Sequence, residues 1–138
     1  MGLTIVDAGV IIAHLDPADA HHAAAGDALG EAFEAYDDLV VPASALAECA
    51  VGAARAGEAT LAHLQRYLSE VPFAVGELTP EVSLRAARLR ARHGRRLRLP
   101  DALVVATAVE ERATRLLTTD RGWPEPASLD LPGVLVVV

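Results

Sequence analysis

Five short runs of apolar residues are spaced along the 138-residue chain, and stretches of helical character separate them. The runs are continuous rather than alternating, which is typical of strands buried on both faces of a parallel sheet. Because strands alternate with helices and the length fits one unit, we predict a single domain over residues 1–138. The expected architecture is a three-layer α/β/α sandwich with a central, mostly parallel five-stranded sheet. The predicted strands cover residues 3–6, 39–42, 73–78, 116–119 and 134–138.

Capping residues and glycines mark the ends of the predicted helices. Thr79-Pro80-Glu81 combines a cap residue, a proline at the first helical position and an acid, which indicates a helix start. Ser44 is expected to cap the helix after the second strand, and Gly57 to end that helix. Together these signals predict helices over residues 9–15, 19–36, 45–56, 58–71, 80–93 and 99–113.

The charge and the aromatic content argue against two classes of nucleic-acid-binding protein. Its net charge of −7 argues against a protein that coats nucleic acid by neutralising phosphates, because such proteins are usually basic. It is compatible with an enzyme that meets phosphates through metal ions held by carboxylates. Aromatic residues make up 4% of the chain, which argues against a base-stacking platform. The positive charge is local, since seven of the 12 basic residues, all arginines, lie between Arg85 and Arg98.

The single cysteine and the five histidines do not indicate a metal site. Cys49 is the only cysteine, which excludes an internal disulfide framework and a cysteine-rich zinc site, and its apolar neighbours predict a buried side chain. The five histidines are interpreted as structural, capping or surface residues. No basic leader precedes the first apolar run, and no apolar stretch has the length of a membrane span. We therefore expect a cytoplasmic location and no membrane partner.

Four acidic residues occupy positions from which their side chains can meet at one edge of the predicted sheet. Asp7 and Asp120 follow strands, Asp101 lies in the first turn of a helix, and Glu48 is the lone charge in an apolar helical stretch. Taken singly, each fits a turn, a cap or a solvent-facing role. Taken together, carboxylates that converge outside the ends of strands repel one another unless a cation lies between them. Because Mg²⁺ and Mn²⁺ prefer oxygen ligands, the pattern favours an acidic metal site, with structural acids as the alternative.

The chain resembles the PIN-domain family, and in particular the VapC-type toxins of bacterial toxin–antitoxin pairs. Four segments carry the resemblance, and they appear in the family's order, at its usual separations and over essentially the whole chain. They are residues 5–13 (IVDAGVIIA), 41–48 (VPASALAE), 99–108 (LPDALVVATA) and 117–123 (LTTDRGW).

This resemblance implies a ribonuclease that hydrolyses RNA phosphodiester bonds with Mg²⁺ or Mn²⁺ and leaves 5′-phosphate and 3′-hydroxyl ends. The family's four acidic positions fall on Asp7, Glu48, Asp101 and Asp120, and the hydroxyl often found beside its site falls on Thr118. By the resemblance, Asp7 and Asp101 hold the metal chiefly, while the other two acids complete the shell directly or through water. A cognate antitoxin and a homodimer are implied as partners, besides the RNA substrate.

Two positions depart from the family pattern, and three arginines lie close to one of its acids. Ala8 stands where similar proteins often have Ser or Thr, and Trp123 replaces a more usual Phe, which we interpret as core packing. Arg95, Arg96 and Arg98 precede Asp101, so they are candidates to guide phosphates or to pair with an acidic segment of the antitoxin. A solvated helix end is the alternative.

Two other functions stay open on the sequence alone. One is a PIN nuclease that acts in RNA processing or on structured DNA. The other is a non-catalytic α/β binding module whose acids are structural. The short chain without an appended domain favours the toxin over the first alternative, and the presence of all four acids favours an enzyme over the second.

Overall fold

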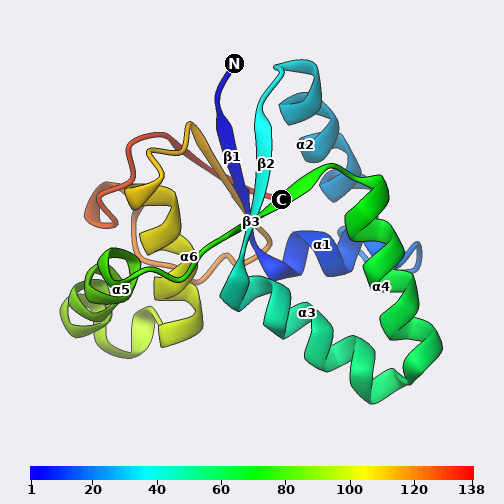
Figure 1. The fold of residues 1–138 in the computed structure, drawn as a ribbon. Helices are drawn as coiled ribbons and strands as arrows, with labels where there is room; N and C mark the ends of the chain where they lie inside the picture. The colour runs from blue at the N-terminus through cyan, green and yellow to red at the C-terminus, as the bar shows by residue number, and fades with distance from the viewer.

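Five strands and six α-helices alternate along the chain in the computed structural model, which describes residues 1–138 (Figure 1). The strands pair in the order β3-β2-β1-β4-β5, and every pair is parallel. The predicted five-stranded sheet is therefore confirmed, and it is wholly parallel. The strands are β1 (Leu3–Val6), β2 (Asp38–Pro42), β3 (Phe73–Gly76), β4 (Arg115–Thr118) and β5 (Val134–Val137).

Helices cover both faces of this sheet, as predicted for three layers. Helices α5 and α6 lie on one face, α1, α2 and α4 lie over the other, and α3 begins at the carboxyl end of β2 (Figure 1). Two short 3₁₀ turns, Gly94–Arg96 and Pro126–Ser128, complete the regular structure. The helices are α1 (Ala8–Leu15), α2 (His22–Glu34), α3 (Ala43–Ala56), α4 (Glu58–Glu70), α5 (Pro80–His93) and α6 (Leu99–Glu110).

Local signals located several helix ends correctly. The hydroxyl of Thr79 accepts a hydrogen bond of 3.2 Å from the backbone N–H of Val82, so it caps α5 as expected. Gly94 ends the same helix with a φ of 57°, and Gly57 follows α3 with a φ of 121°. Both glycines adopt backbone angles that residues with a Cβ rarely reach.

The prediction that Ser44 caps α3 was wrong. The helix begins at Ala43, with Pro42 in the cap position and no side-chain cap bond. Because β2 runs straight into α3, Ser44 already lies inside the first helical turn. Strand β3 also ends at Gly76 rather than at residue 78, because Gly76 pairs with Pro42 and its partner strand β2 ends there.

Two other predicted helices are shorter than the sequence suggested. Helix α2 begins at His22 rather than at residue 19, because the carboxylate of Asp19 accepts the N–H of His21 and closes a turn before the helix. Helix α6 ends at Glu110 rather than near residue 113. There Arg112 adopts a φ of 54°, which breaks the helical path before β4.

The core surrounds β1, the middle strand of the sheet. One cluster contains 31 buried hydrophobic residues, and the side chains of Ile5 and Val6 in β1 are fully buried within it. None of the helices combines the length and the apolar character needed to cross a bilayer. Among the buried residues only Asp7 carries a charge, and it lies where β1 ends.

Candidate metal centre

Asp7 is fixed at the centre of the sheet's carboxyl edge by contacts on both sides. Its Oδ1 accepts the N–H of Ala8 at 2.8 Å, which caps α1, and its Oδ2 accepts the hydroxyl of Thr118 at 2.8 Å. Its own N–H donates to the carbonyl of Leu117 at 3.0 Å. The strand order turns between β1 and β4, and in open parallel sheets such a switch point opens a crevice at the carboxyl ends.

Thr118 and Asp120 form the other side of this crevice, at the end of β4. The buried hydroxyl of Thr118 donates to Asp7 and accepts the N–H of Asp120 at 3.1 Å, so it joins the two acids. The Oδ1 of Asp120 accepts the N–H of Gly122 at 2.7 Å, which closes a tight turn. One hydroxyl and one turn thus set the positions of both acids.

Asp101 and Glu48 reach the same edge from helices. Asp101 is half-buried in the first turn of α6, and Glu48 lies on the more exposed face of α3. Burial raises the pKa of Asp101 to about 6, and the charges of Asp7 and Asp120 add to the increase. Partial burial of the Glu48 carboxyl, followed by the charge of Asp101, raises its pKa as well.

The pKa of Asp7 is also raised. Burial is the largest cause, the hydrogen bonds from Thr118 and Ala8 oppose it, and the charges of Glu48 and Asp120 increase it further. Each of the four acids therefore acts electrostatically on at least one other, although they come from four separate parts of the chain. Repulsion of this kind is relieved when a cation binds among the carboxylates.

The donor set suits a divalent cation that keeps part of its water. As the side chains stand, no three His, Cys, Asp or Glu residues form a group that could hold a metal ion. Mg²⁺ is usually bound through one or two carboxylates and keeps several waters, so it does not require a closed cage. Each oxygen of Asp7 accepts one hydrogen bond and retains a free lone pair. The arrangement fits an ion that contacts one or two of the acids directly and the others through water.

Sequence reasoning missed that the indole N–H of Trp123 is buried without a partner. Its side chain is buried with 8% exposed, which confirms the expected core packing. The indole lowers the pKa of Asp101 slightly against the larger effects of burial and of the neighbouring acids, but its N–H makes no hydrogen bond. The available signal was the tryptophan itself, three residues after Asp120, because an indole carries a donor that phenylalanine lacks.

The arginines between Arg85 and Arg98 include two that form salt bridges, and neither of these is one of the three candidates. Arg85 pairs with Glu110, and Arg92 pairs with Asp130 at 3.1 Å, so these two stabilise the fold locally. Arg98 is exposed at the start of α6 and lowers the pKa of both Asp101 and Glu48. The remaining candidates, Arg95 and Arg96, are exposed in the 3₁₀ turn before it and make no salt bridge.

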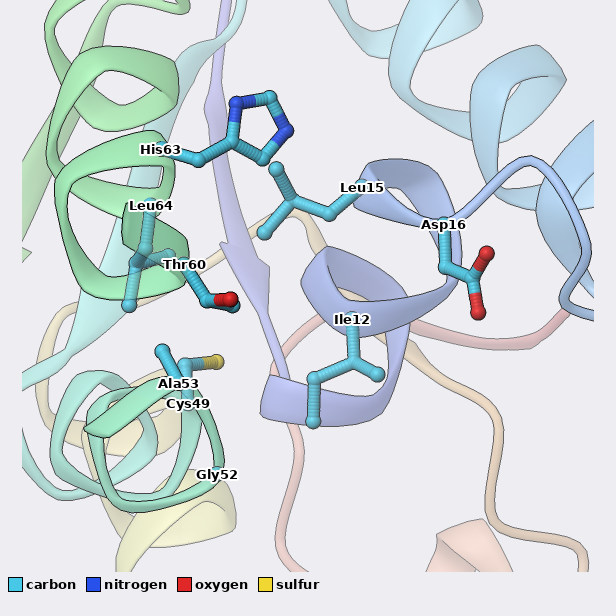
Figure 2. A pocket seen from close by; sticks show the side chains of 9 residues that line it. All are labelled: Ile12, Leu15, Asp16, Cys49, Gly52, Ala53, Thr60, His63 and Leu64. Carbon is cyan, nitrogen blue, oxygen red and sulfur yellow. The ribbon is translucent and has the colours of Figure 1, made fainter. Parts of the chain in front are cut away.

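A mostly apolar cavity has none of the four acids in its lining. This cavity of about 400 Å³ opens between α1, α3 and α4, and Figure 2 shows side chains from all three helices around it. Cys49 lines it with a buried thiol whose pKa is raised to about 12, so it is the inert side chain that the sequence predicted. The lining residues are Ile12, Leu15, Asp16, Cys49, Gly52, Ala53, Thr60, His63 and Leu64.

The histidines lie outside the acidic crevice. His14 Nδ1 and the hydroxyl of Tyr67 share a hydrogen bond of 2.8 Å, which links α1 to α4. His22 Nδ1 bonds the carbonyl of Ala13 at 2.9 Å, and His93 Nε2 bonds that of Ser128 at 3.0 Å. These contacts agree with structural roles.

The chain is similar to known proteins in both sequence and fold. A family model described as the PIN domain matches residues 4–129. Among curated protein sequences, none matches this chain. VapBC2 from Rickettsia felis, solved with a DNA fragment from its promoter, has a TM-score of 0.75 at 15% identity, covering 99% of this chain and 98% of that one.

Two further solved structures share the fold. VapC20 of Mycobacterium tuberculosis, a Sarcin-Ricin loop cleaving toxin, has a TM-score of 0.66 at 17% identity, with 82% of this chain and 86% of that chain covered. A toxin–antitoxin complex from Klebsiella pneumoniae has a TM-score of 0.65 at 23% identity, with 89% and 97% covered. At these identities the likeness is one of fold.

Proposed function

Because this chain belongs to the PIN-domain family, we propose that it is a metal-dependent endoribonuclease and the toxin of a toxin–antitoxin pair. The observation that carries the proposal is the meeting of Asp7 and Asp120 through Thr118 at the switch point between β1 and β4, and the raised pKa values of Asp7, Glu48 and Asp101 agree with it. The Mycobacterium tuberculosis neighbour, named as a toxin that cleaves the Sarcin-Ricin loop, supports RNA as the substrate class. We propose that residues 1–138 act as one domain in this role.

The proposed ion is Mg²⁺ or Mn²⁺, held chiefly by Asp7 and Asp101, with Glu48 and Asp120 in contact directly or through water. When bound, such an ion lowers the pKa of a water molecule and neutralises charge on the attacked phosphate. The chain's own contribution is to hold the ligands in place. Thr118 and the N–H of Ala8 orient the Asp7 carboxylate, and the turn at residues 120–122 orients Asp120.

The direct test incubates the purified protein with total RNA, with and without Mn²⁺, and maps the cleaved ends. We expect cleavage only with the ion, and products with 5′-phosphate and 3′-hydroxyl ends. Asp7→Asn and Asp101→Asn should each lose this cleavage while the fold is kept, whereas Asp27→Asn on the exposed face of α2 should retain it. Near-wild-type cleavage by either site variant contradicts the role of that residue. Cleavage of structured DNA instead of RNA favours the other nuclease function.

We propose that three arginines next to the crevice guide the RNA backbone. Their exposure and the proximity of Arg98 to two of the acids support this role. In a cleavage-dead Asp101→Asn background, their joint neutralisation should weaken RNA binding and flatten the dependence of log affinity on log salt. The slope should change by roughly 0.7 for each phosphate that the protein no longer neutralises. An unchanged slope assigns them to solvent or to a protein partner. The residues are Arg95, Arg96 and Arg98.

We also propose an antitoxin partner and a homodimer. The Klebsiella pneumoniae neighbour, a toxin–antitoxin complex, supports the first of these. Co-expression with the product of an adjacent small gene should silence the cleavage and yield a stable complex on gel filtration. Sedimentation of the protein alone tests the dimer, and a single monomeric species at micromolar concentration contradicts it.

A further inference from the structure

His14 lies in the last turn of α1 and joins that helix to two others. Its Nδ1 shares a hydrogen bond of 2.8 Å with the hydroxyl of Tyr67 on α4, and the two rings meet edge to face with centroids 5.5 Å apart. The imidazole also stacks on that of His22 in α2, with centroids 5.9 Å apart and an angle of 22° between the planes. One side chain thus connects the three helices that cover this face of the sheet (Figure 1).

Protonation of His14 would add a donor that meets no acceptor in the protein. The Nε2 of His14 makes no hydrogen bond, and this edge of the ring lies against α2 at Gly26, where an added Cβ would be 3.9 Å from Nε2. A neutral imidazole can leave Nε2 without a proton, whereas the cation carries an N–H there. The neighbouring ring offers no acceptor in exchange for its own bond, because the Nδ1 of His22 already donates to the carbonyl of Ala13 at 2.9 Å.

The surroundings of His14 also oppose a positive charge on its ring. Two imidazolium rings at the separation of His14 and His22 would repel each other. Burial, followed by the charge of His22, lowers the pKa of His14. The carbonyl end of α1 acts in the opposite sense, since helix carboxyl ends favour cations, but the pKa is lowered in spite of it.

Helix α4 supplies the other titratable groups around His14. A hollow of about 500 Å³ between α1 and α4 contains His63, Arg66 and Glu70 besides the His14–Tyr67 pair. Glu70 is its only acid and forms no salt bridge with His14, while Arg66 adds a further positive charge. Burial raises the pKa of Tyr67, so its hydroxyl keeps the proton that the Nδ1 of a neutral His14 accepts. The site therefore suits the neutral ring.

We propose that the His14 ring is a pH-sensitive contact, which joins α1 to α2 and α4 when it is neutral and releases them when it takes a second proton. The inference does not depend on the metal site or on the proposed function. The hollow shares Leu15 and His63 with the apolar cavity between α1, α3 and α4 (Figure 2). Acidification thus opens that cavity, while the helices on the other face of the sheet keep their places.

The proton equilibrium is tested by NMR on the ring resonances of the five histidines as the pH is lowered. His14, identified by its absence from His14→Asn, should titrate below the ordinary histidine value of about 6.5. His22→Asn removes the repelling ring and should raise that midpoint. His93→Gln is the matched control, because it replaces a half-buried, hydrogen-bonded histidine of α5 and should leave the midpoint unchanged. A midpoint at or above 6.5, or no response to His22→Asn, overturns the inference.

Release of the helices is tested by hydrogen exchange of backbone amides, corrected for the intrinsic effect of pH. Because folding lowers the pKa of His14, its contact contributes fully above pH 6.5 and is lost as the pH falls. Between pH 7.5 and 5.5, opening of α2 and α4 should increase by up to about tenfold, the limit for an unfolded-state pKa of about 6.5. Opening of α6 should not change over the same range.

The variants decide whether His14 causes this opening. In His14→Asn the amide takes the place of Nδ1 and bonds Tyr67 but accepts no proton, so the increase should disappear, whereas His93→Gln should retain it. An increase in His14→Asn equal to that of the wild type overturns the inference, as does equal opening of the wild type at both pH values. If His14→Asn does not fold, the ring signal is identified by its contact with Tyr67. The midpoint of opening must then match the titration of that ring, and a mismatch overturns the inference.

Discussion

Replacing Asp101 by Asn should stabilise the metal-free protein, although it destroys the proposed site. The pKa of Asp101 is raised from 3.8 to about 6, so the folded state disfavours its charge. A shift of about two units corresponds to ~3 kcal/mol at 1.36 kcal/mol each. Because the carboxyl is only half-buried, solvent screening reduces this to about 1–2 kcal/mol. For a chain of this size the melting temperature should rise by roughly 4–8 °C at pH 7.

The stabilisation by Asp101→Asn should increase as the pH rises. Between pH 3.8 and about 6 the folded state holds a proton on Asp101 that the unfolded state has lost. Stability of the wild type therefore falls as pH rises through this window, and the penalty is complete above it. Asn carries no charge, so the advantage of Asp101→Asn should vanish near pH 4 and reach its full value by pH 7.

Thermal unfolding followed by circular dichroism, with and without millimolar Mn²⁺, measures both effects. A ligand that binds only the folded state stabilises it by mass action, so Mn²⁺ should raise the melting temperature of the wild type but hardly that of Asp101→Asn. The control is Asp27→Asn, an exposed α2 acid outside the crevice, which should behave as the wild type does. If metal-free Asp101→Asn is no more stable than the wild type at pH 7, burial and the neighbouring acids do not disfavour the ionised form of Asp101 in the folded state.

Three further experiments test separate interactions. Thr118→Val removes the buried hydroxyl that serves Asp7 and should cost about 1–3 kcal/mol in urea unfolding, and a neutral change would contradict its bridging role. Thr79→Ala should cost about 1 kcal/mol because it removes the cap of α5, whereas Ser44→Ala, which loses no cap, should stay within ~0.5 kcal/mol in the same assay. The thiol of Cys49, buried and with a pKa raised to about 12, should react with a disulfide reagent only after unfolding, and rapid reaction of the native protein would refute this.

The elements of the fold were readable from the sequence because their signals are local. Continuous apolar runs indicate buried strands, and the cap at Thr79 and the glycine at position 94 mark the ends of α5 within a few residues. The same local logic placed Asp7 directly after β1 and Asp101 in the first turn of α6. It failed at Ser44, where the preceding strand continues into the helix and shifts its start by two residues.

Only the tertiary structure decided which of these elements meet. The order β3-β2-β1-β4-β5 places β4 beside β1, and this brings Thr118 to Asp7 across 111 positions of the chain. The same packing buries the indole of Trp123 and leaves its N–H without a hydrogen-bond partner. Propensity and periodicity act over a few residues, whereas these contacts depend on how crossover helices return the chain to the sheet. The sequence therefore determines the elements and the candidate acids, and the packing of the sheet determines their neighbours, their burial and their pKa values.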